Sequence, residues 1–182
     1  MLREDLLDLN DILQHPGRVL AVDVTTELLQ EEDLDLVQPL DGYLEAISTG
    51  NLLLITGEFK ARAVFECARC AGPLELDIEF QIDEQFNVVG TPSSLSHQDF
   101  AKVDADEPYP LFEGNNLMVE ALLRQSLLLN YPTQALCDYG WDGDCPVAKE
   151  RGADKLTQLT TRQEFEQLKT LVEPSDQSEE EQ

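Results

Sequence analysis

Four cysteines are the residues of this chain whose type and spacing could do chemistry. Cys67 and Cys70 are separated by two residues in "ECARC". Further along the chain, Cys137 and Cys145 are separated by seven residues in "CDYGWDGDC". A two-residue gap at a tight turn lets two sulfurs reach one tetrahedral metal, whereas the second gap is longer than the two to four residues usual for zinc. The spacing leaves two interpretations open: free, half-buried thiols, or a structural zinc site on Cys67, Cys70, Cys137 and Cys145.

Other chemistry has weaker support from the residue types. A thioredoxin-type redox couple needs its cysteines at the start of a helix, where the thiol pKa falls, but this pair lies between segments that alternate like strands. Asp138, Asp142 and Asp144 could give a metal oxygen ligands, as in a metal-dependent hydrolase or nuclease, although Asp and Gly are also typical of a turn. No glycine-rich phosphate loop is present, and the two histidines, His15 and His97, lie in connections. The sequence therefore predicts a protein that is not an enzyme.

The first cysteine pair lies at the tip of a predicted β-hairpin. From residue 42 onward the alternation predicts a meander with strands at residues 43–49, 52–59, 60–67 and 73–86. A register slip of one residue would move every apolar side chain to the other face, so we expect a register that brings Arg62 close to Asp77 or Glu79.

The elements around the meander complete an α+β fold. Leucines spaced by three and four predict an N-terminal helix that stops at "HPG", and residues 115–132 predict a central buried helix. Thr161 and Glu164 form a capping box for a helix at residues 159–174. Residues 18–24 indicate a strand, 25–42 an acidic connection with some helical character and 87–113 a long loop.

The predicted architecture is an antiparallel β-meander sheet, which could close in part, packed by the central helix and flanked by short terminal helices. Three regions follow from this assignment: an N-terminal helix, strand and acidic connection (1–42), a core with both cysteine pairs (43–148), and a C-terminal helix with an acidic tail (149–182).

Charge limits the choice of partner. The chain has 37 acidic and 12 basic residues, a net charge of −25, and such a surface repels nucleic-acid phosphates unless its few cations cluster. A basic protein partner is therefore favoured, with simple solvation as the other interpretation. Lys60, Arg62, Arg69 and Arg124 could form a local RNA-binding patch, or could serve as ion-pair partners of the acidic strand face.

The sequence also bears on the compartment. No run reaches the 18 or so apolar residues of a membrane span, and the acidic N-terminus does not resemble a signal peptide. We expect a cytoplasmic protein whose cysteines are reduced or bound to metal.

Two stretches, "GEFKARAVFECARC" and "LLRQSLLLNYPTQALC…CPVA", resemble the YceD family of bacteria and plastids over roughly residues 40–148. "DLNDILQHPGR" is similar to cyanobacterial members in particular. Many members have additional cysteines in the second cluster, where this chain has only Cys137 and Cys145. The resemblance implies a ribosome-biogenesis factor linked to accumulation of large-subunit (23S) ribosomal RNA, with no catalytic residues to assign. Combined with the charge, it predicts a non-catalytic factor that binds a basic ribosomal protein or a pre-large-subunit particle.

Overall fold

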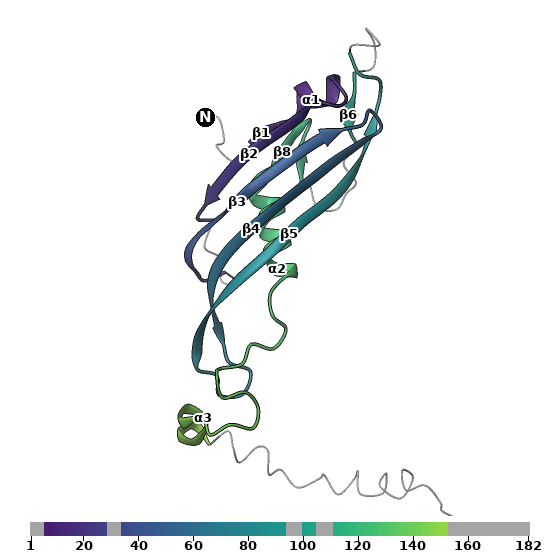
Figure 1. The fold of residues 1–182 in the computed structure, drawn as a ribbon. Helices are drawn as coiled ribbons and strands as arrows, with labels where there is room; N and C mark the ends of the chain where they lie inside the picture. The colour runs from purple at the N-terminus through teal and green to yellow at the C-terminus, as the bar shows by residue number, and fades with distance from the viewer. Residues whose placement is uncertain (1–5, 29–33, 94–99, 105–110, 153–182) are drawn as a thin grey trace, which may run out of the picture. The chain divides into compact units, whose positions relative to one another are not determined.

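The computed structural model describes residues 6–28, 34–93, 100–104 and 111–152 (Figure 1). The chain forms two compact units, which are described separately. The first, called the sheet unit, comprises the described parts of residues 1–65 and 73–135. The second, called the cysteine unit, comprises residues 66–72 and the described residues from 136 onward. The division into regions predicted from the sequence, at residues 42 and 148, stays a prediction.

A curled, half-barrel antiparallel sheet dominates the sheet unit (Figure 1). Its strands follow in chain order: β2 (Val19–Thr26), β3 (Leu36–Ser48), β4 (Leu52–Glu66), β5 (Pro73–Val89) and β6 (Lys102–Val103). A smaller sheet has the order β1 (Leu6–Asp8), β8 (Asn116–Met118), β7 (Phe112–Glu113). The predicted antiparallel meander is therefore confirmed, and its strands are longer than the sequence indicated.

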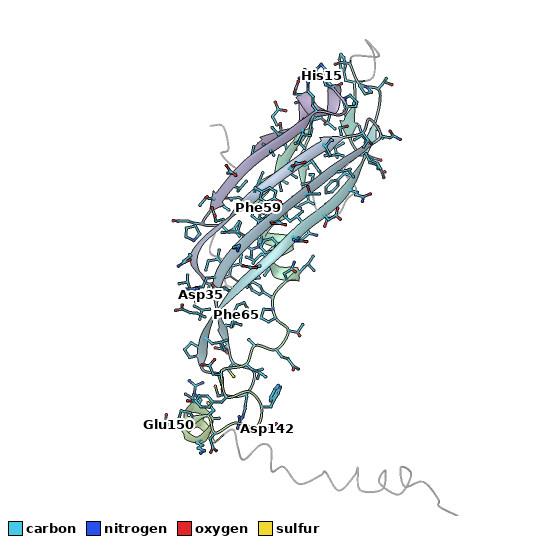
Figure 2. The ribbon with its side chains drawn as sticks, in the orientation of Figure 1. His15, Asp35, Phe59, Phe65, Asp142 and Glu150 are labelled. Atoms are coloured by element: carbon cyan, nitrogen blue, oxygen red, sulfur yellow. The ribbon has the colours of Figure 1, made fainter. Side chains whose placement is uncertain are left out.

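Alternation along the strands separates a core face from a solvent face. On β5, Ile78, Phe80 and Ile82 are buried, while the acidic residues between them are exposed. Phe59 of β4 lies at the centre of the core, where its ring stacks on Phe80 with centroids 5.7 Å apart (Figure 2). The alternation itself thus selects which face packs inward.

Phe59 also explains two glycines in the neighbouring strand positions. A Cβ atom at Gly42 would lie 2.5 Å from the Phe59 ring, and one at Gly57 would lie 2.8 Å from it. Real Cβ contacts are not this short, so the ring occupies the space that a side chain at either position would need. These glycines allow Phe59 to lie flat on the sheet.

The N-terminal prediction was only partly right. Leu6 and Leu7 lie in strand β1, where they pair with Met118 and Leu117, and the helix α1 is limited to Asn10–Gln14. This helix ends at His15, as predicted. The leucine spacing suits a helix, but hydrogen bonding to β8 outweighs that local preference for Leu6 and Leu7.

The central buried helix is not confirmed. Residues 116–118 belong to β8, and α2 (Val119–Leu129) is an 11-residue helix with one buried face. Leu123 and Leu127 on that face are fully buried, whereas Leu129 is 77% exposed. Apolar residues around the whole helix predict full burial, but some of them face solvent.

Several connections turned out to be strands. Residues 36–42 belong to β3 rather than to a helical connection, and the register shifts between Leu36 and Asp41 fit Pro39, which cannot donate a backbone hydrogen bond. Residues 52–59 and 60–67 lie almost entirely in one continuous strand, β4. Within 87–113, β5 continues to Val89, and β6 and β7 add short strands. The helix predicted at 159–174 lies outside the described residues.

None of the helices in the described part of the chain is long and apolar enough to cross a membrane.

Candidate metal centre

The first half of the cysteine unit is the turn that joins β4 to β5. Cys67 follows the last residue of β4, and its amide N–H donates to the carbonyl of Gly72 at 2.9 Å. The Ala71 N–H donates back to the Cys67 carbonyl at 2.8 Å, with Ala71 in the left-handed region at φ 52°. This narrow turn places Cys67 and Cys70 together, and both are buried.

The second half precedes the short helix α3 (Pro146–Arg151). Cys145 is the N-cap of α3, where its sulfur accepts a hydrogen bond from the Ala148 N–H at 3.4 Å. Pro146 occupies the first turn, and Gly152 caps the other end in the left-handed conformation. This helix was not predicted from the sequence, although proline at its first position and glycine after its last are both signals of a helix.

The cysteine sulfurs of the two halves converge. The Sγ atoms of Cys67, Cys70 and Cys137 all lie within 4.8 Å of one another, so these three residues are close enough to hold a metal ion. The Sγ of Cys145 is 4.0 Å from that of Cys137. A tetrahedral zinc with Zn–S bonds of about 2.3 Å would separate its sulfurs by roughly 3.8 Å. The spacing of Cys67, Cys70 and Cys137 is compatible with such an ion, whereas Cys145 lies beside this group and is not one of its three members.

Backbone amides point at the sulfurs and favour thiolates. Burial raises the pKa of Cys67, but hydrogen bonds from the N–H groups of Cys70, Cys137 and Arg69 outweigh it and lower the pKa to about 6. The Ala148 N–H is the main cause of the lowered pKa of Cys145, against an opposing effect of burial. Metal ligation requires the thiolate form, which these hydrogen bonds support.

The other two thiols show the effect of crowding. The Gly72 N–H favours the Cys70 thiolate, but burial and the neighbouring sulfurs of Cys67 and Cys145 raise the pKa of Cys70 to about 11. The pKa of Cys137 is also raised: the Tyr139 N–H lowers it, and burial together with Cys67 and Cys145 outweighs that effect. Several thiolates at this spacing repel one another, and a divalent cation bound between them would offset that repulsion.

Two arginines fasten the cysteine unit. Arg69, between the first two cysteines, donates from Nη1 to the carbonyls of Gly140 at 3.0 Å and Gly143 at 2.7 Å. Arg151 of α3 donates to the carbonyls of Cys70 at 3.2 Å and Ala71 at 2.7 Å. Each half therefore donates hydrogen bonds from an arginine to backbone carbonyls of the other half. Neither role was predicted from the sequence.

The aspartates predicted as alternative oxygen ligands do not join the sulfurs. Among the described residues, the group with metal-binding geometry contains cysteines alone. Asp142 and Asp144 are exposed, and Asp144 forms an ion pair with Lys149 at 2.9 Å. Asp138 is also exposed, in the same loop.

Each residue of the predicted basic patch has contacts within its own unit. On the solvent face of the sheet, Lys60 pairs with Glu79 at 2.8 Å and Arg62 with Asp77 at 2.6 Å. The expected approach of Arg62 to Asp77 is thus confirmed. Arg69 bonds to loop carbonyls, and Arg124 lies on α2, where its charge acts on Tyr131. Their role as RNA contacts stays a prediction.

Comparison with known proteins identifies the family. Residues 55–172 match the family described as "Large ribosomal RNA subunit accumulation protein YceD", a span of well over half of the chain that includes all four cysteines. No curated protein and no solved structure matches. The similarity to cyanobacterial members stays a prediction. The family is one of ribosomal RNA accumulation factors and not a known enzyme family, and on this match the chain belongs to the YceD family.

Proposed function

We propose that this protein is a non-catalytic ribosome-biogenesis factor of the bacterial cytoplasm, which supports maturation of 23S ribosomal RNA by binding a basic ribosomal protein or an assembly intermediate. The family description supports the link to large-subunit RNA. The partner's chemistry is inferred from the charges that the sheet presents to solvent.

The solvent face of the large sheet is the observation that carries this proposal. Within the sheet unit, β2 to β5 bear eight carboxylates and two basic side chains on this face. The carboxylates belong to Asp23, Asp41, Glu45, Glu58, Glu75, Asp77, Glu79 and Asp83. We call this surface the acidic face.

The two cations of the acidic face are already neutralised within it. Lys60 and Arg62 are bound to Glu79 and Asp77, so six carboxylates remain without an ion pair among the described contacts. The half-exposed Tyr43 lies between Asp23 and Glu58 in neighbouring strands and adds contact area. A face of this composition attracts lysine- and arginine-rich protein and repels the RNA backbone.

We also propose that Cys67, Cys70, Cys137 and Cys145 bind one structural zinc. Four sulfur ligands fill a tetrahedral site and leave no position for substrate, so such a zinc would stabilise without catalysing. It would join two segments that are about 70 residues apart in the chain, and the free energy of metal binding would become folding free energy of the cysteine unit. Metal analysis of the purified protein should give one zinc per chain, and Cys145→Ser should abolish retention of the ion.

Co-purification tests the partner. The full chain would be captured from nuclease-treated bacterial lysate at low and at high salt, and the bound proteins identified by mass spectrometry. Electrostatic binding across an exposed face weakens once charges are screened beyond about 8 Å. We expect a basic ribosomal protein that is lost at high salt; capture that is unchanged in molar salt would contradict the proposal.

Direct RNA binding through Lys60, Arg62, Arg69 and Arg124 is the alternative function. Its prediction is distinct, because charge-neutral substitutions at Arg62 and Arg69 would then reduce RNA association. Gel-shift measurements with 23S fragments decide between binding of a basic protein and direct binding of RNA. Unchanged RNA binding in these variants would eliminate the alternative.

A further inference from the structure

The loop between Cys137 and Cys145 presents two aromatic side chains to solvent. Tyr139 is 49% exposed and Trp141 is 51% exposed. A buried aromatic side chain removes about 150–250 Å² from water, so leaving two of them half-exposed in one loop forgoes considerable stabilisation. Exposed Tyr and Trp are also the residues most enriched in the centres of protein interfaces.

The backbone of this loop is held in one conformation. The Gly140 N–H donates to the Cys137 carbonyl at 2.8 Å, and the Gly143 N–H donates to the Tyr139 carbonyl at 2.9 Å. Arg69 binds the carbonyls of Gly140 and Gly143. A Cβ at Gly143 would lie 2.3 Å from the Tyr139 carbonyl oxygen, so this position requires glycine. Because the loop is already ordered, a partner would lose little affinity to loop ordering.

The charge of the loop indicates what it can bind. Asp138, Asp142 and Asp144 alternate with the aromatics, and no basic residue lies between Cys137 and Cys145. Figure 2 shows Asp142 on this loop. Lys149 forms an ion pair with Asp144. Asp138 and Asp142 are exposed and directly adjoin Tyr139 and Trp141 in the chain. Aromatic faces next to carboxylates attract cations, and a guanidinium can stack on a ring while it hydrogen-bonds to an acid.

We propose that the loop of residues 138–144, called the aromatic loop, binds an arginine-bearing extended segment of a basic protein. The guanidinium stacks on Trp141 or Tyr139 and donates to Asp142 or Asp138. The class of partner rests on the function proposed above, and the aromatic loop is the new contact site. Single-stranded RNA could also stack on the rings, but its phosphates would then lie against three aspartates.

Trp141 is the only tryptophan of the chain, so its fluorescence reports on this loop directly. The purified full chain would be titrated at physiological salt with a 12-residue peptide of alternating arginine and glycine. A lysine–glycine peptide and a 12-nucleotide uridine RNA serve as comparisons. We expect a saturable change of Trp141 fluorescence with the arginine peptide, a weaker response to lysine and none to RNA.

Two variants and a control locate the binding site. Tyr139→Ala and Asp142→Asn should each lower the affinity for the arginine peptide by about tenfold. This is the loss expected for a cation–π contact or a charged hydrogen bond. Both side chains are exposed, so the variants should keep the fold, which circular dichroism checks. Phe100→Ala removes a comparably exposed aromatic side chain, 52%, that belongs neither to the acidic face nor to the aromatic loop, and it should not change the fluorescence titration.

Several results would overturn the inference. They are peptide binding detected by anisotropy without a change at Trp141, tighter binding of the RNA, or unchanged affinity in both loop variants. A cellular test separates this failure from failure of the proposed function. If deletion of the gene lowers 23S RNA and Trp141→Ala with Tyr139→Ala restores it fully, the loop inference fails and the function stands. If deletion leaves 23S RNA unchanged, the function fails, and the peptide titration alone decides the loop.

Discussion

Arg69→Leu tests whether this arginine is a structural brace or a contact for RNA. Its guanidinium makes at least two hydrogen bonds, to Gly140 at 3.0 Å and Gly143 at 2.7 Å. A hydrogen bond to a charged group contributes about 1.5–3 kcal/mol, and we halve the total because Arg69 is half-exposed. The expected loss is then about 1.5–3 kcal/mol of stability in the cysteine unit. If the metal binds only the folded unit, zinc affinity should fall by about ten- to a hundredfold.

Competition against a colorimetric zinc chelator measures this change, and Arg62→Leu is the matched control. Arg62 belongs to the sheet unit, and its ion pair with Asp77 is exposed to solvent, so it contributes little to stability. The brace role predicts a large loss of zinc affinity for Arg69→Leu and none for Arg62→Leu. Equal zinc affinity in both variants would refute it, and an equal loss of RNA binding in both would favour the basic patch.

Three further predictions address the sheet, its ion pairs and the metal. Phe59→Ala creates a cavity and should destabilise the sheet unit by about 3–5 kcal/mol in denaturant titrations. Gly57→Ala drives a Cβ into the Phe59 ring and should cost about 1–3 kcal/mol. Unchanged unfolding midpoints would contradict the packing described. The hydrogen bond from Arg62 lowers the pKa of Asp77, against an opposing effect of burial. The pair therefore stabilises the fold above the unfolded pKa of Asp77, and this stabilisation is lost as pH falls through the folded pKa. NMR titration should show the Asp77 pKa rising towards its ordinary value in Arg62→Leu. An unchanged Asp77 pKa would contradict Arg62 as the cause of the shift. Zinc chelation, like Cys67→Ser, should speed hydrogen exchange in the cysteine unit while amides of β3 and β4 keep their protection; loss of protection in both units together would show that the metal supports the whole chain.

The sequence predicted the features that depend on local pattern. Alternation on β5 was enough to place the Cys67–Cys70 turn at a hairpin tip and to bring Arg62 to Asp77, because strand period and register are set by neighbouring residues. Packing decided the rest. Leu6 and Leu7 have helical spacing, yet pairing with a strand more than 100 residues away makes them part of β1.

The candidate site shows the same division. Cys67 and Cys70 were recognised by their spacing, and the convergence of Cys137 depends on chain geometry that spacing does not specify. The brace role of Arg69 was missed because its acceptors are backbone carbonyls, which carry no signature in the sequence. The aromatic loop was interpreted as a turn, and only the exposed fractions of Tyr139 and Trp141 mark it as a surface.

The accumulation of 23S ribosomal RNA, measured against 16S in a bacterium whose own copy of the gene is deleted, tests the central claim most directly. Complementation would compare the wild-type chain with two variants that each lose four negative charges. One is neutralised on the acidic face, at Asp23, Glu45, Glu58 and Asp83; the control is neutralised at exposed acids elsewhere, at Glu27, Asp35, Asp104 and Glu113. We predict that deletion lowers the 23S to 16S ratio, that the wild type and the control restore it, and that the acidic-face variant does not. Full restoration by the acidic-face variant at equal protein level would contradict capture of a basic partner by this face.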